Sequence, residues 1–231
     1  MTSPPAAATK PSWPYGSSSF LWSSLPLRLR TAWWLSAASR TIEILRQTCE
    51  SLIEAHAHGL VHRDIKPSNV YLCEFGGIYD FVKVLDFGLV KTEQSEDAAR
   101  VTGKDAIIGT AAFMPPEQAA GGEVDARSDL YALGCVGYWL LTRRLPFEGT
   151  MIEVLLGHAS EAPPPISTRS PSPVPADLEN LLMRCLAKRR EDRPESAGAL
   201  HEELTACQAG AAWTQAQAKC WWDEHAARQP T

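Results

Sequence analysis

A run of twelve uncharged residues at 130–141 limits the folds that this chain can adopt. Wound into a helix, the run is apolar on every side, whereas a helix at a protein surface carries a polar stripe. The run is also too short to cross a membrane, which takes about 20 residues. We therefore expect a helix buried in the middle of a helical core, and no transmembrane helix.

The segments around this run predict more helices and a few short strands. Helices are expected where apolar residues recur at three- and four-residue steps: about 41–58, 152–156, 178–185 and 197–204. Two β-type runs, at 70–72 and 79–85, flank the turn residues Gly76-Gly77. Six prolines between 162 and 175 predict an extended connection. The expected fold class is mainly α (α+β), with the strands at one edge.

Residues 1–40 differ in composition from the rest of the chain. No Asp or Glu precedes Glu43, and the 27 acidic residues that follow face only 18 basic ones. Prolines interrupt this head and it has no clean period, so we expect it to be unstructured; a signal or transit peptide is less favoured. Residues 41–206 form the expected domain. Residues 207–231 are predicted to hold a tryptophan-containing helix, which packs on the domain or binds a partner.

Charge and cysteine content exclude some classes of function. The net charge is −5 and the isoelectric point is near 5.7, so no basic field exists for sequence-independent binding of nucleic acid. The six cysteines are scattered without a Cys-x-x-Cys pair, which argues against a zinc site. Scattered thiols suit a reducing compartment, so we expect a cytoplasmic protein.

Two short motifs carry chemistry: His-Arg-Asp-Ile-Lys-Pro-Ser-Asn at 62–69 and Asp-Phe-Gly at 86–88. Phosphoryl transfer requires a carboxylate near the acceptor hydroxyl, a cation near the phosphoryl group and oxygen ligands for magnesium. Asp64 can be the carboxylate, Lys66 the cation, and Asn69 and Asp86 the metal ligands. The 17-residue step between the two metal ligands leaves room for a hairpin that brings them together.

With Pro115-Pro116-Glu117, these motifs resemble the protein kinase superfamily, in particular the bacterial (eukaryotic-like) Ser/Thr kinases. The resemblance covers about 40–206, the length of a kinase C-lobe. The lysine two residues after Asp64 is the Ser/Thr-type variant, whereas Pro115 replaces the family's alanine. The resemblance implies ATP as the phosphoryl donor, Mg²⁺ or alternatively Mn²⁺ as the metal, and a Ser or Thr hydroxyl of a protein as the acceptor.

The resemblance also implies a role for individual residues. Asp64 would orient the substrate hydroxyl and accept its proton, and Lys66 would contact the γ-phosphate. Asn69 and Asp86 would hold the metal, and Gly109-Thr110 would dock the substrate. Supporting roles fall to His62, Arg63, Phe87, Gly88, Glu117, Asp129 and Arg193.

Among these supporting residues, Arg193 would pair with Glu117, and Asp129 would hold the catalytic loop. A phosphate on the loop after the Asp-Phe-Gly motif could pair with Arg63. Its candidate acceptors are Thr92, Ser95 and Thr102.

Some motifs of a complete kinase do not occur in this sequence. It has no Gly-x-Gly-x-x-Gly, and Lys10 is the one lysine before Lys66. Forty residues cannot form the five strands and helix of an N-lobe, which need about 70. The acid-free head resembles out-of-frame coding, so we expect a kinase truncated by a frameshift or a misplaced start and nearly inactive by itself. A non-catalytic binding module is the alternative.

Overall fold

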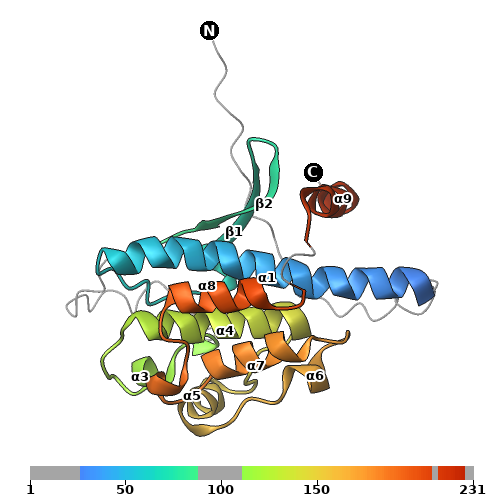
Figure 1. The fold of residues 1–231 in the computed structure, drawn as a ribbon. Coiled ribbons are helices and arrows are strands. Elements are labelled where there is room, and N and C mark those ends of the chain that lie inside the picture. The colour runs from blue at the N-terminus through green and yellow to red at the C-terminus, as the bar shows by residue number, and fades with distance from the viewer. Residues whose placement is uncertain (1–26, 88–110, 210–212, 227–231) are drawn as a thin grey trace.

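The computed structural model describes residues 27–87, 111–209 and 213–226, and within them it is mostly helical with one two-stranded sheet. The elements are α1 (Leu27–Ala57), η1 (Pro67–Asn69), β1 (Val70–Phe75), β2 (Ile78–Val84), α3 (Pro116–Ala119), α4 (Ala126–Thr142), α5 (Met151–Ser160), α6 (Ile166–Arg169), α7 (Ala176–Cys185), η3 (Arg190–Asp192), α8 (Ala197–Ala206) and α9 (Gln215–Ala226). Figure 1 shows α1 lying across α4 and α8, with α7 on the other side of α4.

Helix α4 is the central helix that the apolar run predicts. Nearly all of its residues are buried, and its N-terminus is capped by Asp125, whose side chain accepts a hydrogen bond from the first turn. Gly134 and Gly137 allow α7 to approach closely, because a Cβ atom at Gly134 would lie 2.7 Å from the Cβ of Cys185. The prediction of a buried core helix is confirmed.

Helix α1 begins earlier than the sequence period indicates. The periodicity predicts a helix from about residue 41, whereas the helix starts at Leu27, directly after Pro26. The expectation of an unstructured head is therefore wrong for 27–40; residues 1–26 lie outside the described part. Alanine, leucine and arginine are frequent in this stretch, and extending an existing helix costs less than starting one. The predicted end is correct, since Gly59 has φ 73° just after the last turn.

Each of the other helices that the sequence predicts is present, with two differences, and the structure adds the one-turn helix α3. Helices α7 and α8 bury the apolar faces that the sequence predicts. Helix α5 instead buries Val154, Gly157 and His158 and exposes Ile152 and Leu156. The proline-rich connection is not wholly extended, because it contains the one-turn helix α6, whose Ile166 is fully buried.

Strands β1 and β2 form an antiparallel hairpin whose turn is Gly76-Gly77, as predicted. Both glycines have positive φ (61° and 82°), which the favoured two-residue hairpin turns require. Gln47 of α1 holds the hairpin, since its side-chain amide donates to the carbonyl of Asp80 and accepts from the amide of Val82. The middle of β2 is thereby fixed against α1.

Helix α9 lies beside the hairpin (Figure 1), and the carboxylate of Asp80 in β2 joins the two. This carboxylate, 1% exposed, accepts two hydrogen bonds from Arg40 at 2.7 and 2.8 Å. It also accepts the indole N–H groups of Trp213 at 3.0 Å and Trp222 at 2.8 Å. The guanidinium of Arg40 lies 3.4 Å from the ring centroid of Trp221. Four hydrogen-bond donors therefore compensate the cost of burying the Asp80 carboxylate, and the Trp221 ring stacks on the arginine that provides two of them.

Candidate active site

The loop at 62–69 is held from below by Asp129, which lies in the first turn of α4. Its carboxylate accepts the backbone N–H groups of His62 and Arg63, each at 2.8 Å. Arg63 has φ 65°, a left-handed conformation that costs a non-glycine residue about 1–2 kcal/mol. Two charge-assisted hydrogen bonds offset that cost, because they fix the amide of the strained residue and the amide before it.

His56 is a third partner of Asp129, and the sequence did not predict this contact. Its Nε2 lies 2.9 Å from Oδ2 of the same carboxylate, at the end of α1. The carboxylate is 1% exposed, so it needs partners to balance its burial. In the sequence, His56 stands four residues after Leu52, on the same face of the helix. That spacing indicates a core residue and does not point to a contact with Asp129.

His62 connects the loop to the Asp-Phe-Gly segment. It is fully buried, and its Nδ1 accepts the backbone N–H of Asp64 at 3.3 Å. The ring therefore carries its proton on Nε2, which donates to the carbonyl of Leu85 at 3.0 Å. The ring of Phe87 packs on His62 with centroids 4.7 Å apart. These contacts fix the position of the residues on both sides of Asp86.

Asp64, Lys66 and Asn69 meet at the surface of this loop. Lys66 Nζ lies 2.8 Å from Oδ2 of Asp64, and the side-chain amide of Asn69 donates to the same oxygen at 3.2 Å and to the Asp64 carbonyl at 2.8 Å. Ile65 between them is buried in the main core, which turns its two neighbours outward. A partly exposed carboxylate with a cation and an amide beside it is the result.

The hairpin brings Asp86 close to Asn69 along the backbone. Val70 pairs with Val84, and the N–H of Leu85 donates to the carbonyl of Asn69 at 2.8 Å. Asp86 follows at once, exposed and with φ 59°. The side-chain amide of Asn69 donates to Asp64, so its side-chain carbonyl oxygen can serve as a ligand to a metal ion. The Asp86 carboxylate and the Asn69 side-chain oxygen are of the kind that a hard divalent cation prefers.

Several predicted residues lie outside the described part of the chain. They are Gly88, Gly109 and Thr110, and the candidate phosphate acceptors Thr92, Ser95 and Thr102.

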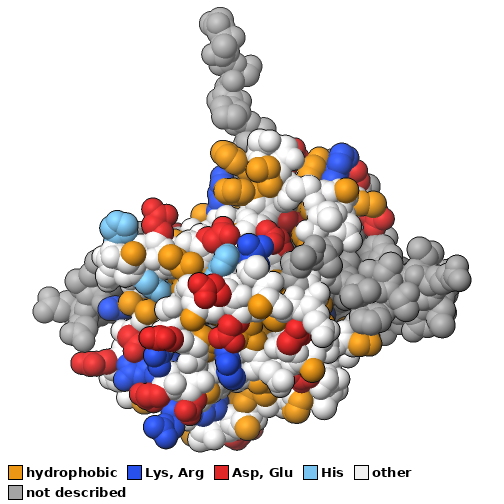
Figure 2. All heavy atoms as spheres, viewed as in Figure 1, with side chains coloured by type: hydrophobic (Ala, Val, Ile, Leu, Met, Phe, Trp, Pro, Cys, Tyr) orange, Lys and Arg blue, Asp and Glu red, His pale blue; other side chains and the backbone are white. Residues whose placement is uncertain are grey.

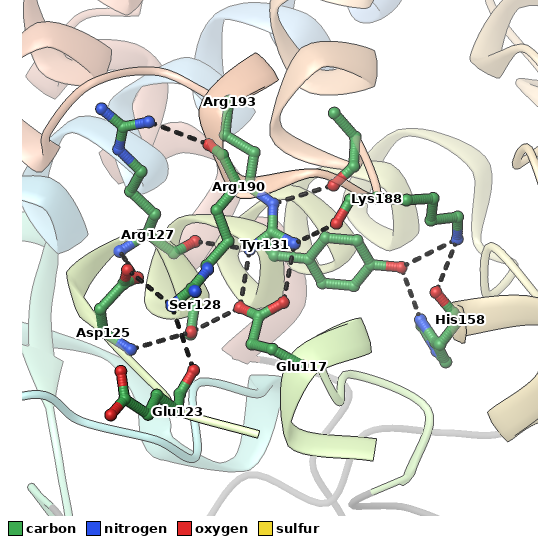
Figure 3. Close-up of polar contacts among 11 residues, drawn as sticks. Glu117, Glu123, Asp125, Arg127, Ser128, Tyr131, His158, Lys188, Arg190 and Arg193 are labelled. Carbon is green, nitrogen blue, oxygen red and sulfur yellow. Dashed lines mark hydrogen bonds and ion pairs between the residues drawn. The ribbon is translucent and has the colours of Figure 1, made fainter. Parts of the chain in front are cut away.

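Glu117 and Arg193 form a buried ion pair (Figure 3). Both guanidinium NH groups donate to the carboxylate at 2.8 Å, and the Arg193 side chain is completely buried. Its remaining N–H groups donate to the carbonyls of Ala187, Arg127 and Lys188. Burial raises the pKa of Glu117, but the hydrogen bonds from Arg193 and Ser128 outweigh it, so this pKa lies below its usual value. The pair ties α3, which contains Glu117, to Arg193 at the end of η3.

The face in Figure 2 carries interspersed acidic and basic side chains over its lower part, and hydrophobic side chains gather at the tip of the hairpin. There Phe75 and Ile78 are 55% and 48% exposed. In the part of the chain that the structure describes, no helix is long and apolar enough to cross a bilayer.

Comparison with known proteins places these motifs in a family. The family model of the protein kinase domain matches residues 29–205. The serine/threonine-protein kinase Pkn1 of Myxococcus xanthus is 45% identical over 73% of this chain, and pkn3 of the same organism is 40% identical over 75%. The serine/threonine-protein kinase PknB of Mycolicibacterium smegmatis is 39% identical over 73%.

The aligned part covers 24%, 32% and 26% of these three relatives, so the chain spans about a quarter to a third of their length. The matched region contains the loop at 62–69, the hairpin and the buried pair of Glu117 and Arg193. The chain belongs to the protein kinase family and is similar to the bacterial Ser/Thr kinases within it.

Proposed function

We propose that this chain supplies the C-lobe of a Ser/Thr protein kinase, which transfers the γ-phosphate of ATP to a Ser or Thr hydroxyl of a protein. The observation that carries the proposal is the cluster of Asp64, Lys66 and Asn69, held against the core by Asp129. Positioning and charge stabilisation make up most of the catalysis of phosphoryl transfer, and a fixed cluster supplies both.

Asp64 acts on the acceptor hydroxyl. Its partly exposed carboxylate orients the hydroxyl and accepts its proton as the oxygen attacks phosphorus. Lys66, 2.8 Å from that carboxylate, places a positive charge where the phosphoryl oxygens gain negative charge in the transition state. Asn69 fixes the carboxylate through its amide, so that the carboxylate remains aimed while the hydroxyl arrives.

Asn69 and Asp86 hold the divalent metal, which we take to be Mg²⁺, with Mn²⁺ as an alternative. Kinases of this family use ATP with a divalent metal, which neutralises charge on the phosphates when it is bound. These two side chains fit a hard divalent metal, because the Asn69 N–H groups already donate to Asp64. The Asn69 side-chain oxygen and the Asp86 carboxylate oxygens remain as ligands. The strained backbone at Asp86 keeps its carboxylate at the end of β2, next to Asn69.

The chain by itself is proposed to turn over slowly or not at all. The glycine-rich loop and strand lysine that grip the ATP phosphates do not occur in its sequence. Losing one preorganised donor costs about 10²–10³ in rate, and here two elements of the nucleotide site are missing. An N-lobe from another source should therefore restore transfer.

The test compares the 231-residue chain with a chimera in which the N-lobe of Pkn1 precedes residue 38. Transfer of radiolabelled phosphate to a Ser/Thr-rich protein is measured for each. The chimera should be active, and Asp64→Asn should lower its kcat by about 10²–10⁴. Asp223→Asn, which alters an exposed carboxylate on α9, is the matched control and should leave the rate unchanged.

Two outcomes would contradict the proposal. A chimera whose transfer is insensitive to Asp64→Asn would show that another group does the chemistry. A folded chimera without any transfer would favour the non-catalytic binding module instead. Activity of the 231-residue chain above that of its Asp86→Asn variant would refute the proposed dependence on an N-lobe.

A further inference from the structure

A row of buried polar groups crosses the lower half of the domain and ends on the segment just before α3. Lys188 Nζ lies 3.4 Å from the hydroxyl of Tyr131, and that hydroxyl lies 2.8 Å from Nδ1 of His158. The other ring nitrogen of His158 lies 3.1 Å from the carbonyl oxygen of Ala112. Figure 3 shows the lysine, tyrosine and histidine converging from three parts of the chain.

The chemistry of its two ends fixes the direction of this row. An ammonium group only donates hydrogen bonds and a carbonyl oxygen only accepts them. Lys188 therefore donates to the Tyr131 oxygen, the Tyr131 hydroxyl donates to Nδ1 of His158, and Nε2–H of His158 donates to Ala112. The neutral imidazole with its proton on Nε2 satisfies this arrangement. With the proton on Nδ1 instead, Nδ1 could not accept the Tyr131 hydroxyl, and Nε2 would have no proton to donate to Ala112.

The surroundings favour the neutral ring. His158 is fully buried, with the ring of Phe147 edge-on at 5.0 Å. Burial, and then the positive charge of Lys188, lower the pKa of His158 to about 4. Burial also raises the pKa of Tyr131, so its hydroxyl keeps the proton that it donates. Lys188 makes two further hydrogen bonds, at 2.8 Å each, to the carbonyls of Gly157 and His158.

The carbonyl that receives this row belongs to a segment beside the proposed active site. Ala111 and Ala112 are 2% exposed, and the next residues, Phe113 and Met114, line a cavity that also contains Asp64. Gln118 of α3 lines the same cavity, and its side-chain carbonyl oxygen is buried without a hydrogen-bond partner in the described structure. The position of the 111–114 backbone thus shapes one wall of a cavity that Asp64 also lines.

We propose that Lys188, Tyr131 and His158 are positioning residues, which hold the 111–114 backbone at a fixed height and so shape the substrate side of the site. The part of this inference that concerns substrate rests on the proposed function. The alternative is that His158 is an ordinary buried histidine whose hydrogen bonds only compensate its burial. In that alternative the hydrogen bond from Nε2 to Ala112 would satisfy the ring but would not hold the 111–114 backbone in place.

Hydrogen exchange of the 231-residue chain, measured by mass spectrometry without nucleotide or substrate, separates the two. His158→Asn leaves no donor at the Nε2 position, whereas His158→Gln carries an N–H at about that position. In the Asn variant, amides of 111–116 should exchange about tenfold faster, while those of α4 and α7 keep their protection. The Gln variant should stay within about threefold of the wild type.

Three results would overturn the proposal. The first is wild-type exchange in both variants, and the second is faster exchange that extends equally to α4 and α7, which means general destabilisation. The third comes from the nitrogen NMR spectrum of the wild-type His158 ring at pH 7, if the proton lies on Nδ1 or on both nitrogens. The NMR measurement decides the matter even where neither variant folds. Because neither method measures phosphate transfer, failure of the proposed function leaves both readouts valid.

Discussion

Acidification from pH 7 to pH 5 should destabilise this protein through His158. Its pKa in the folded protein is about 4, whereas an unburied histidine has a pKa of 6.5. The folded ring therefore stays neutral at pH 5 while the unfolded chain binds a proton. A depressed pKa of this kind gives stability that is fully present above pH 6.5 and is lost progressively as the pH falls toward 4.

The size of the effect follows from the same two values. Each pH unit between the two pKa values is worth about 1.4 kcal/mol, and pH 5 lies 1.5 units below the unfolded value, so the loss at pH 5 is about 2 kcal/mol. The pKa of Glu117 is also lowered, from 4.5, and its loss of stability has the same sign. That loss begins below pH 4.5, so the range from 7 to 5 separates the histidine from the carboxylate.

The assay is urea denaturation of the wild type and His158→Gln at pH 7, 6 and 5. Glutamine does not titrate, so the free energy of unfolding should fall by about 2 kcal/mol more in the wild type than in the variant. The other five histidines are present in both proteins and cancel in the difference. Equal pH dependence of the two proteins would refute the claim that His158 is neutral and buried.

Three further predictions concern buried groups. Glu117→Gln should lower the free energy of unfolding by roughly 3 kcal/mol in chemical denaturation, because it leaves a buried guanidinium without its counter-charge; a loss below about 1 kcal/mol would contradict this. Asp80→Asn should cost a similar amount and change the tryptophan fluorescence, whereas Asp223→Asn in an exposed pair should cost under about 1 kcal/mol. Gly134→Ala should lower the melting temperature through a loss of about 1–3 kcal/mol, since its new methyl group meets α7; an unchanged melting temperature would show that the helices separate freely.

The proposed catalytic cluster could be predicted because its members are neighbours in the sequence. Asp64, Lys66 and Asn69 lie within six residues, so a single loop conformation brings them together. The partner that fixes the loop, Asp129, was implied by the family resemblance and not by any spacing. The contact of Asp129 with His56 was missed, because it joins positions 73 residues apart.

The sequence by itself determined the buried central helix, the hairpin with its glycine turn, and the loop at 62–69, because each depends on periodicity or on chemistry within a few residues. Only the tertiary structure decided where α1 begins, which face of α5 is buried, and which groups surround His158 and Asp80. In the last two cases the side chains that share hydrogen bonds with them come from segments 27 to 142 residues away. Local preference cannot specify such contacts, since desolvation and hydrogen-bond satisfaction are properties of the packed chain as a whole.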